Sequence, residues 1–395
     1  MDLQCAVMRY DWGQLGSRSL VAQLAVKNDP LFEIEESCPY AEWWMGTHHN
    51  GPSVLKVHNK LLKEYIQDDP TCLGNSLSTF GPDLPFLLKV LSVRKALSIQ
   101  VHPNKEDAQT LHLKYPKMYT DSNHKPELAV ALTKFEALCG FRQLEEIADF
   151  LKSIPELCNL INAEYSQNFI RQPSIKLLEL CFSSYITAAP VECKKSAAKL
   201  IQRWEQSDFK LREMQMEHLF LRLNKQFPED IGLFAIYFLN HITLSPGEAL
   251  FLEAGLPHAY LHGNCVEVMA RSDNVVRAGL TPKVRDVATL IKIIKYNPTS
   301  IENLKFYATY FDKFISIYKP PVNDFALARI CLPREQMYTL PMLKTASLLF
   351  VLSGTAENEY FDIETGMVLF LPSEFIITLT VTSDVLEMYQ AHANV

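Results

Sequence analysis

Residues 97–102 alternate strictly between apolar and polar side chains, reading LSIQVH. Successive side chains of a β-strand point to opposite faces, so a period of two is typical of a strand that is buried on one side. The apolar face would pack into a core. The other face would present Ser98, Gln100 and His102 together. We therefore expect this strand to supply ligands.

The longer pattern divides the chain into β and helical parts. Residues 1–142 read as short strands and turns broken by glycine and proline. Residues 143–228 instead follow a period of 3.6, which predicts about four or five helices, with Pro155, Pro173 and Pro190 where helices would begin. This block holds one histidine and no cluster of reactive residues, so we predict an inserted helical domain with a structural role.

Strand character returns at Ile231, and Pro246 and Gly247 mark a turn between two apolar strands. A helix is predicted at 284–294. From about residue 320, short apolar runs alternate with glycine or proline, which predicts a second antiparallel sandwich or barrel. Its clearest strands are expected at 348–352, 368–371 and 376–381.

One charged residue interrupts an otherwise apolar strand at 86–91. This residue, Lys89, either extends to solvent along the strand or points into a site that needs a positive charge, and the pattern leaves both open. Glu42 has a similar setting beside Trp43 and Trp44, which read as core or rim aromatics. Both residues are candidates for a polar cavity.

A second polar segment spans residues 119–127. Pro126 pushes Lys125 into an extended conformation, which would align Asn123, Lys125 and Glu127 on one side. A third segment adds a histidine after Pro257. Together the segments offer two nitrogen and two oxygen ligands, from Gln100, His102, Glu127 and His258. Such a set suits a tetrahedral divalent metal ion, and zinc is the first candidate. Any one of these histidines alone would more often be structural.

Composition narrows the function classes. The chain has 395 residues, 48% hydrophobic and 21% charged, which predicts a folded globular protein of two or three domains. Its formal charge of -7 argues against a general nucleic-acid binder but allows a local basic pocket for an anionic substrate. The longest apolar run, 231–239, is too short to span a membrane.

The nine cysteines are scattered and form no CxxC pair. This pattern favours reduced thiols over a disulfide framework or a thiolate metal site. The first residues lack the basic and apolar regions of a signal peptide. We expect a cytoplasmic protein with no membrane or nucleic-acid partner.

Four blocks of sequence resemble the type I phosphomannose isomerases. They are YAEWWMGTH from Tyr40, LSIQVHPNK from Leu97, YTDSNHKPE from Tyr119 and HAYLHGNCVEVMARSDNVVRAGLTPK from His258. The resemblance implies a mainly β fold with two cupin-like β-barrel (jelly-roll) domains and an inserted α-helical domain. The catalytic β domain would comprise 1–142 and 229–319, the insertion 143–228, and the carboxyl-terminal β domain 320–395.

Residue by residue, the resemblance implies one zinc ion per chain at the same four ligands, Gln100, His102, Glu127 and His258. It places the family's catalytic arginine at Arg277, and no quoted position is broken. The family's other pocket residues correspond to Glu42, Lys89, Ser98, Lys125, Tyr260, Glu267 and Lys283.

The implied reaction interconverts mannose 6-phosphate and fructose 6-phosphate through a cis-enediol, in mannose metabolism upstream of GDP-mannose and protein glycosylation. Arg277 stays cationic, which suits charge stabilisation better than proton abstraction. Lys125, Glu267 and a zinc-bound water remain open as the base. Ser98, Lys89 and Arg277 are candidates for the phosphate. We expect a small sugar phosphate substrate and a monomer.

Two rival functions use a similar barrel. An iron-dependent cupin oxygenase would need two histidines, a carboxylate and open coordination positions, whereas Gln100 offers a fourth ligand here. A sugar-binding cupin without activity would not need Arg277, Lys125 and Glu267. His124 would point away from Lys125 in an extended segment and is expected to support the site only.

Overall fold

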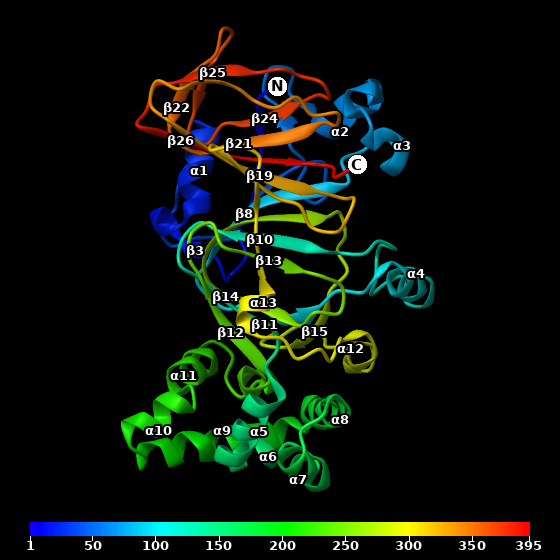
Figure 1. Ribbon diagram of the computed structural model, residues 1–395, viewed down its shortest axis with the longest axis vertical. Helices are drawn as coiled ribbons and strands as arrows, with labels where there is room; N and C mark the ends of the chain where they lie inside the picture. Colours follow the sequence, from blue (N-terminus) through cyan, green and yellow to red (C-terminus); the bar gives the residue numbers. More distant parts are fainter.

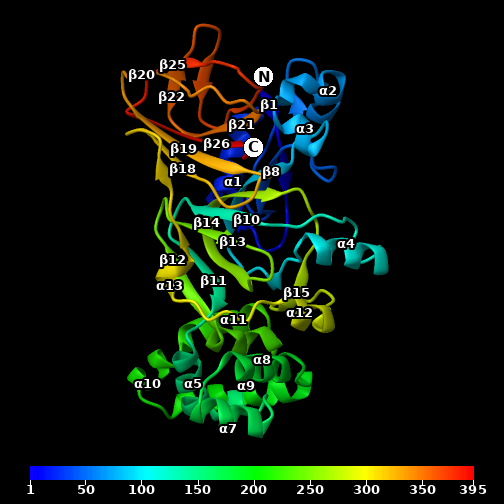
Figure 2. The same cartoon turned by 45° about the vertical axis from the view of Figure 1, so that its right-hand side comes forward.

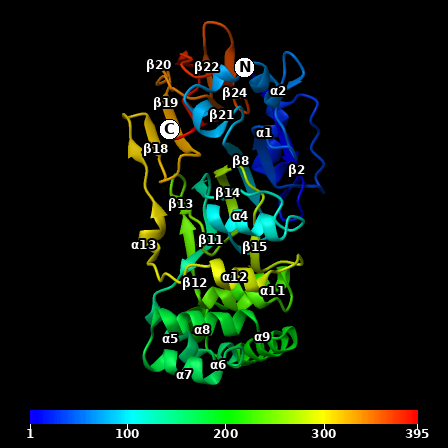
Figure 3. The same ribbon diagram turned by 90° about the vertical axis from the view of Figure 1, so that its right-hand side faces the viewer.

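The computed structural model describes residues 1–395. Three parts are stacked along its long axis: two sheets at the top, a central group of strands, and helices at the bottom (Figure 1). The same order is visible from two further directions (Figures 2 and 3). Both chain ends lie in the upper part, where the amino group of Met1 donates a hydrogen bond to the Phe370 carbonyl oxygen (3.0 Å).

The spine of the central part is β14 (His258–Ala270), a strand of 13 residues. Its second half pairs with β8 (Phe86–Val93) and β10 (Glu127–Ala131), and its first half pairs with β11 (Phe135–Phe141). Gly263 lies at the change of partner with φ +111, and a Cβ there would lie 2.4 Å from the Lys134 carbonyl oxygen. Only glycine fits this crossing point.

Two short strands bring distant residues into register at the lower end of the central sheet. They are β9 (Ile99–Val101) and β15 (Val276–Gly279). Gln100 of β9 lies opposite His258 on one side and opposite Arg277 on the other. The strand predicted at 97–102 is therefore present but shorter. The predicted buried strand at 86–91 is confirmed as part of β8, all of whose residues are buried.

The helical part contains seven helices where four or five were expected. The shortest two, α6 and α10, span four and six residues, which is too short for a repeated 3.6 pattern to be recognised. In the first of these helices, the apolar residues Ile147, Ala148 and Leu151 are buried. The helices are α5 (Leu144–Ser153), α6 (Pro155–Cys158), α7 (Ala163–Arg171), α8 (Ile175–Ile186), α9 (Pro190–Glu205), α10 (Phe209–Met214) and α11 (Glu217–Gln226).

The strand predicted from Ile231 is wrong. This segment forms the 3₁₀ helix η3 (Ile231–Tyr237), and the next strand, β12 (Leu239–Leu244), begins later. Every residue of η3 is buried, so it is apolar on all sides and shows no period that separates helix from strand. The predicted turn after β12 is present, and it leads into β13 (Ala249–Leu252).

The upper part consists of two antiparallel sheets around their own core. The six-stranded sheet orders its strands as β17, β18, β19, β26, β21 and β24, and the four-stranded sheet as β20, β25, β22 and β23. Their bounds are β17 (Thr309–Tyr310), β18 (Ile315–Tyr318), β19 (Ala326–Pro333), β20 (Met337–Thr339), β21 (Ser347–Ser353), β22 (Thr355–Glu357), β23 (Asp362–Glu364), β24 (Val368–Leu371), β25 (Thr378–Val381) and β26 (Val385–His392). The predicted second antiparallel unit is thus present.

Apolar packing joins the upper and central parts. Trp43 on β5 (Glu42–Met45) meets Phe350 of β21 edge to face, with ring centroids 6.3 Å apart. The predicted fold class, mainly β with an inserted helical domain, is confirmed. No helix has both the length and the apolar character that crossing a membrane requires. Further elements of the chain are β2 (Ala6–Met8), α1 (Leu20–Asn28), α2 (Leu62–Asp68), α3 (Ser76–Phe80), α4 (Lys105–Lys114), α12 (Val287–Ile293), α13 (Ile301–Leu304) and β16 (Lys305–Phe306).

Candidate active site

Three predicted metal ligands converge in the interior of the central part. The ligand atoms of His102, Glu127 and His258 all lie within 4.8 Å of one another, and all three residues are buried. His102 Nε2 is 3.4 Å from Glu127 Oε1, and His258 Nε2 is 3.3 Å from Glu127 Oε2. The side chain of Gln100 reaches the same point, with its amide nitrogen 3.4 Å from His258 Nε2.

The hydrogen bonds of the two histidines leave one nitrogen of each ring facing the cluster. His102 Nδ1–H donates to the Asn274 carbonyl (2.7 Å), and His258 Nδ1–H donates to the Leu256 carbonyl (2.9 Å). A carbonyl only accepts, so the proton sits on Nδ1 and the lone pair on Nε2 points inward. Such outer partners commonly orient the histidines of metal centres.

Two buried atoms of the cluster have no hydrogen-bond partner, His102 Nε2 and Glu127 Oε2. Leaving buried polar atoms unsatisfied is costly, and a cation would satisfy both at once. Burial lowers the pKa of His102 to about 4, against the opposing effect of Glu127, so the ring is neutral as a ligand must be. Burial opposes ionisation of Glu127, but the ammonium group of Lys125, 3.3 Å away, holds its pKa well below the ordinary value. The donor set therefore fits a divalent zinc ion.

One carboxylate organises the turn that orients His102. Asp121 accepts hydrogen bonds from Ser272 Oγ (2.8 Å), the Asp273 amide (2.7 Å) and Asn274 Nδ2 (3.1 Å). The Asn274 carbonyl is thereby fixed where His102 needs it. Sequence analysis missed Asp121 and Asn274, because a contact made through a backbone carbonyl leaves no residue-type signature.

A buried network of charged and polar groups lies behind the metal cluster. Glu267 accepts from Lys89 Nζ (2.9 Å) and Tyr260 Oη (2.8 Å) through its two oxygens. Lys89 also lies 3.8 Å from Glu42, which in turn accepts a hydrogen bond from Trp44 Nε1. Lys89 thus points inward, which resolves the alternative that its strand left open.

Burial raises the pKa of Glu267, and the nearby carboxylates Glu127 and Glu42 raise it further, which outweighs the effect of Lys89. The pKa of Lys89 is also raised, because Glu267 and Glu42 outweigh burial, so its ammonium group stays charged. Lys125 lies at the junction of network and metal cluster, with Nζ 3.3 Å from Glu127 Oε1.

An open cavity of about 310 Å³ adjoins the metal cluster. Five predicted site residues line it: Glu42, Ser98, Gln100, Arg277 and Lys283. The guanidinium of Arg277 is half-buried and forms no hydrogen bond or ion pair with another residue, and burial lowers its pKa. A cation held in this way is available to a ligand. Lys89, Tyr260 and Glu267 lie behind the cavity.

Several lining residues were missed by sequence analysis. Tyr10 and Trp12 stack on each other with ring centroids 5.9 Å apart at the edge of the cavity, and Asp11 lies between them in sequence. Phe227 comes from the end of the helical insertion. In the sequence, these aromatic residues read as ordinary core or rim residues, so no pattern marked them as lining a cavity.

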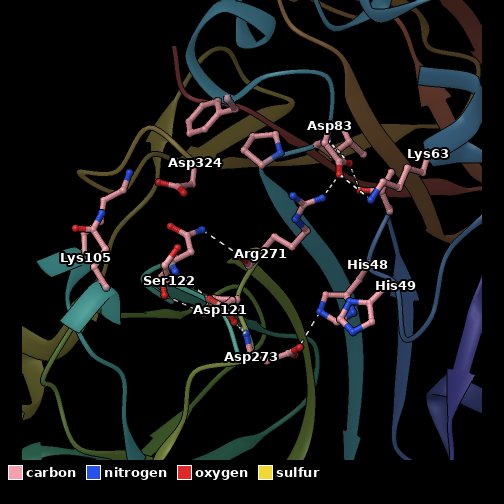
Figure 4. Close-up of a pocket in the computed structure, with 17 residues that line it drawn as sticks. His48, His49, Lys63, Asp83, Lys105, Asp121, Ser122, Arg271, Asp273 and Asp324 are labelled. Carbon is pink, nitrogen blue, oxygen red and sulfur yellow. Dashed lines mark hydrogen bonds and ion pairs between the residues drawn. The ribbon is translucent and has the colours of Figure 1, made fainter. Parts of the chain in front are cut away.

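A second, larger cavity of about 490 Å³ lies beyond the 272–274 turn (Figure 4). His48 Nε2 is 3.3 Å from Asp273 there, and His49 is close enough to suggest a metal site. However, His48 Nδ1 accepts a hydrogen bond from the Asn50 amide (3.3 Å), which places the ring proton on Nε2. That proton points to Asp273, so both ring nitrogens of His48 have a partner without an ion.

Residues 119–127 only partly follow the predicted alignment. Lys125 and Glu127 share the metal side, but Asn123 lines the second cavity and donates to the Arg271 carbonyl (3.1 Å). The reason is that regular strand geometry begins only at Glu127. His124 points elsewhere as expected, with Nε2 3.1 Å from Asp324.

Comparison with known proteins agrees with this geometry. Residues 1–144 match the catalytic domain of phosphomannose isomerase type I, and residues 156–239 match its helical insertion domain. The human mannose-6-phosphate isomerase is 43% identical over 96% of this chain and 95% of its own length. The chain belongs to the type I phosphomannose isomerases.

Other members of the family align equally far. Mannose-6-phosphate isomerase 1 of Arabidopsis thaliana is 41% identical, covering 99% of this chain and 93% of its own. Among solved structures, a mannose 6-phosphate isomerase bound with zinc and yttrium superposes with a TM-score of 0.86 at 28% identity. The apo form from Salmonella typhimurium gives 0.85 at 29% identity, and both alignments cover 100% of this chain and 99% of the other.

Proposed function

We propose that this protein is a zinc-dependent isomerase that interconverts mannose 6-phosphate and fructose 6-phosphate through a cis-enediol. The observation that carries the proposal is the pair of unsatisfied buried atoms, His102 Nε2 and Glu127 Oε2, beside a cavity that holds the unpaired guanidinium of Arg277. The name of the relatives supplies the substrate pair. The zinc-bound relative supports the choice of metal.

The metal would be held by Gln100, His102, Glu127 and His258, one ion per chain. Two neutral imidazoles, one amide and one carboxylate would leave it a net charge of about +1, so it could supply Lewis-acid polarisation of the sugar oxygens. Gln100 would turn its carbonyl oxygen toward the ion, since amide oxygen and nitrogen are interchangeable by a flip.

The isomerisation moves a proton from C2 to C1 while a second proton moves between the two oxygens. We propose that Lys125 and Glu267 accept and donate these protons. The contact of Lys125 with a metal ligand and the raised pKa of Glu267 support the assignment. Arg277 would stabilise the charge that develops on the enediolate.

The phosphate is proposed to bind at the open side of the cavity. Ser98, Arg277 and Lys283 all line it and offer a hydroxyl and two cations. Lys89, also expected at the phosphate, contacts two carboxylates instead, so we propose that it acts on substrate through Glu42 and Glu267. Tyr260 would also act through Glu267, because it donates a hydrogen bond to the other oxygen of that carboxylate.

We further propose a cytoplasmic monomer in mannose metabolism, upstream of GDP-mannose. The proposed domains are a catalytic β domain of 1–142 and 229–319, an insertion of 143–228 and a carboxyl-terminal β domain of 320–395. The buried apolar contacts between central and upper parts support one cooperative catalytic unit.

The deciding experiment combines metal analysis with an assay of fructose 6-phosphate formation from mannose 6-phosphate. We expect about one zinc per chain, loss of activity with a chelator, and recovery on adding zinc. Activity that survives complete metal removal would contradict the proposal. Oxygen consumption with bound iron would favour an oxygenase, and sugar binding without turnover would favour a non-catalytic protein.

A further inference from the structure

The last residues of the helical insertion, together with Asp230 just after it, contact both walls of the substrate cavity. On one wall, Gln226 Oε1 accepts a hydrogen bond from the Ala96 amide (2.9 Å). Beside it, Lys95 Nζ lies 4.6 Å from the centre of the Phe227 ring. This wall continues directly to Ser98, which lines the cavity. The insertion therefore fixes the backbone that carries a proposed phosphate ligand.

On the adjoining wall, Asp230 binds the turn that follows β15, the strand that pairs with β9. Its carboxylate accepts hydrogen bonds from the amides of Leu280 (2.7 Å) and Thr281 (3.3 Å). The same carboxylate accepts from the Gly232 amide (2.7 Å) at the start of η3. One side chain thus joins the segment just after the insertion to the turn, since two of its three bonds come from amides of the turn and the third from the start of η3. A charged acceptor strengthens such bonds.

The turn needs this restraint because Leu280 adopts φ +51. A left-handed conformation is unfavourable for a leucine, which persists in it only where neighbouring contacts impose it. The backbones also meet closely: a Cβ on Gly279 would lie 2.6 Å from the Gly232 Cα atom. The turn connects Arg277 on β15 with Lys283, and both of these cations line the cavity.

We propose that Gln226, Phe227 and Asp230 form a clasp that positions the two walls of the cavity, with Asp230 as the principal positioning residue. The clasp sets the distance between Ser98 on one wall and Lys283 on the other, and hence the affinity for the phosphate group. This inference rests on the proposed function of the cavity. It gives the helical insertion a part in substrate binding although it holds no metal ligand.

The test compares Asp230→Ala and Asp230→Asn in the zinc-loaded full-length protein. Alanine removes all three hydrogen bonds, so we expect KM for mannose 6-phosphate to rise by about tenfold while kcat changes by less than about threefold. Asparagine keeps an oxygen for the two 2.7 Å bonds and should restore most of the affinity. Zinc content should equal that of the unsubstituted protein in both variants.

Gln226→Met tests the other wall, because methionine keeps the length of the side chain and loses the acceptor. We expect a smaller rise in KM than for Asp230→Ala. Calorimetric titration with fructose 6-phosphate should show the same order of affinities without relying on turnover.

Asp208→Ala is the matched control. Asp208 caps α10 in the same insertion, accepting from the Leu211 amide (2.8 Å), and contacts neither wall. Its loss should cost stability but leave KM unchanged. An unchanged KM in Asp230→Ala, or an equal rise in Asp208→Ala, would overturn the clasp. A lack of isomerase activity in the unsubstituted protein would instead overturn the proposed function.

Discussion

The metal cluster and the substrate cavity are neighbours, yet they are built differently. His102, Glu127 and His258 have 0%, 2% and 1% of their surface exposed and come from strands of one sheet or the residues beside them. The cavity is lined instead largely by connecting segments, such as residues 95–98 and 280–283, and by the end of the helical insertion.

Metal binding and substrate binding therefore depend on separate structural supports. Strand pairing holds Gln100, Glu127 and His258 rigidly, because each lies between two neighbouring strands, and His102 directly follows β9. The cavity walls depend on a few side chains that bridge loops. Substitutions can therefore be chosen to damage one property and spare the other, and the following variants test that separation.

The largest effect is expected for His258→Ala. Loss of one imidazole from a four-ligand site should remove zinc and lower turnover by about a thousandfold or more, the scale of several kcal/mol of Lewis-acid stabilisation. Metal content and activity would be measured on the same sample. His262→Ala is the control, because His262 lies on the same strand but is exposed. Full zinc content in His258→Ala would break the distinction between the two supports.

Arg277→Ala should lower kcat by about a hundredfold or more while zinc stays bound, because a donor to the developing charge is lost. Arg277→Lys should recover little, since one ammonium cannot reproduce the planar two-point contact. Steady-state kinetics would distinguish this role from one in which Arg277 only binds the phosphate. If Arg277 only bound the phosphate, KM would rise in Arg277→Ala and kcat at saturation would stay near normal.

Asp121→Ala should act on the metal side only. Without this carboxylate the 272–274 turn no longer holds the Asn274 carbonyl against His102, and zinc affinity should fall by about 10-fold to 100-fold. Competition with a chromogenic chelator would measure the affinity, and KM measured at saturating zinc should change little. Asp149→Ala, at an exposed aspartate of α5, should leave zinc affinity unchanged.

The smallest effect is expected for a residue at the contact between the helical insertion and the central sheet. His241 Nε2 lies 3.5 Å from Glu136, and Arg222 of α11 donates a hydrogen bond to the same carboxylate; both neighbours lower the pKa of Glu136 to about 2. The folded-state pKa lies below the unfolded value, so the contribution to stability is present above about pH 4.5 and is lost as pH falls towards 2. Glu136→Gln should cost about 1 kcal/mol at pH 7, because solvent screens this partly exposed pair.

Thermal unfolding at several pH values would test this prediction. The difference between Glu136→Gln and the unsubstituted protein should shrink as pH falls below 4.5, and zinc content and KM should be unaffected at pH 7. A difference that is constant with pH would show that the carboxylate charge contributes nothing there.

Sequence patterns predicted the strands and the ligands because both depend on side-chain type. Alternation at 97–102 identified Gln100 and His102, and an apolar run identified β8 with Lys89 inside it. The untested site roles remain predictions. Patterns failed where the segment was uniformly apolar, as in η3, or too short for a period, as in α6 and α10.

Contacts made through the backbone also could not be predicted from the sequence. The carboxylate of Asp230 accepts only from backbone amides, and the Asp273 backbone amide donates to Asp121, so these partners carry no identifying side chain. The left-handed Leu280 was hidden for the same reason, since leucine is not a residue that marks such a turn. Such residues become visible only when the two segments are seen side by side.

The hydrogen bond between Met1 and Phe370 has a consequence for synthesis of the chain. Asp2 also forms a β-bridge with Leu369, so residues 1 and 2 complete a sheet whose other strands are translated much later. At about 5 to 20 residues per second, the interval between them is about 20 to 70 seconds. During that time the strand at the start of the chain has no partner in the upper sheets. We expect the nascent chain to expose this edge to chaperones until residues 368–371 have been translated.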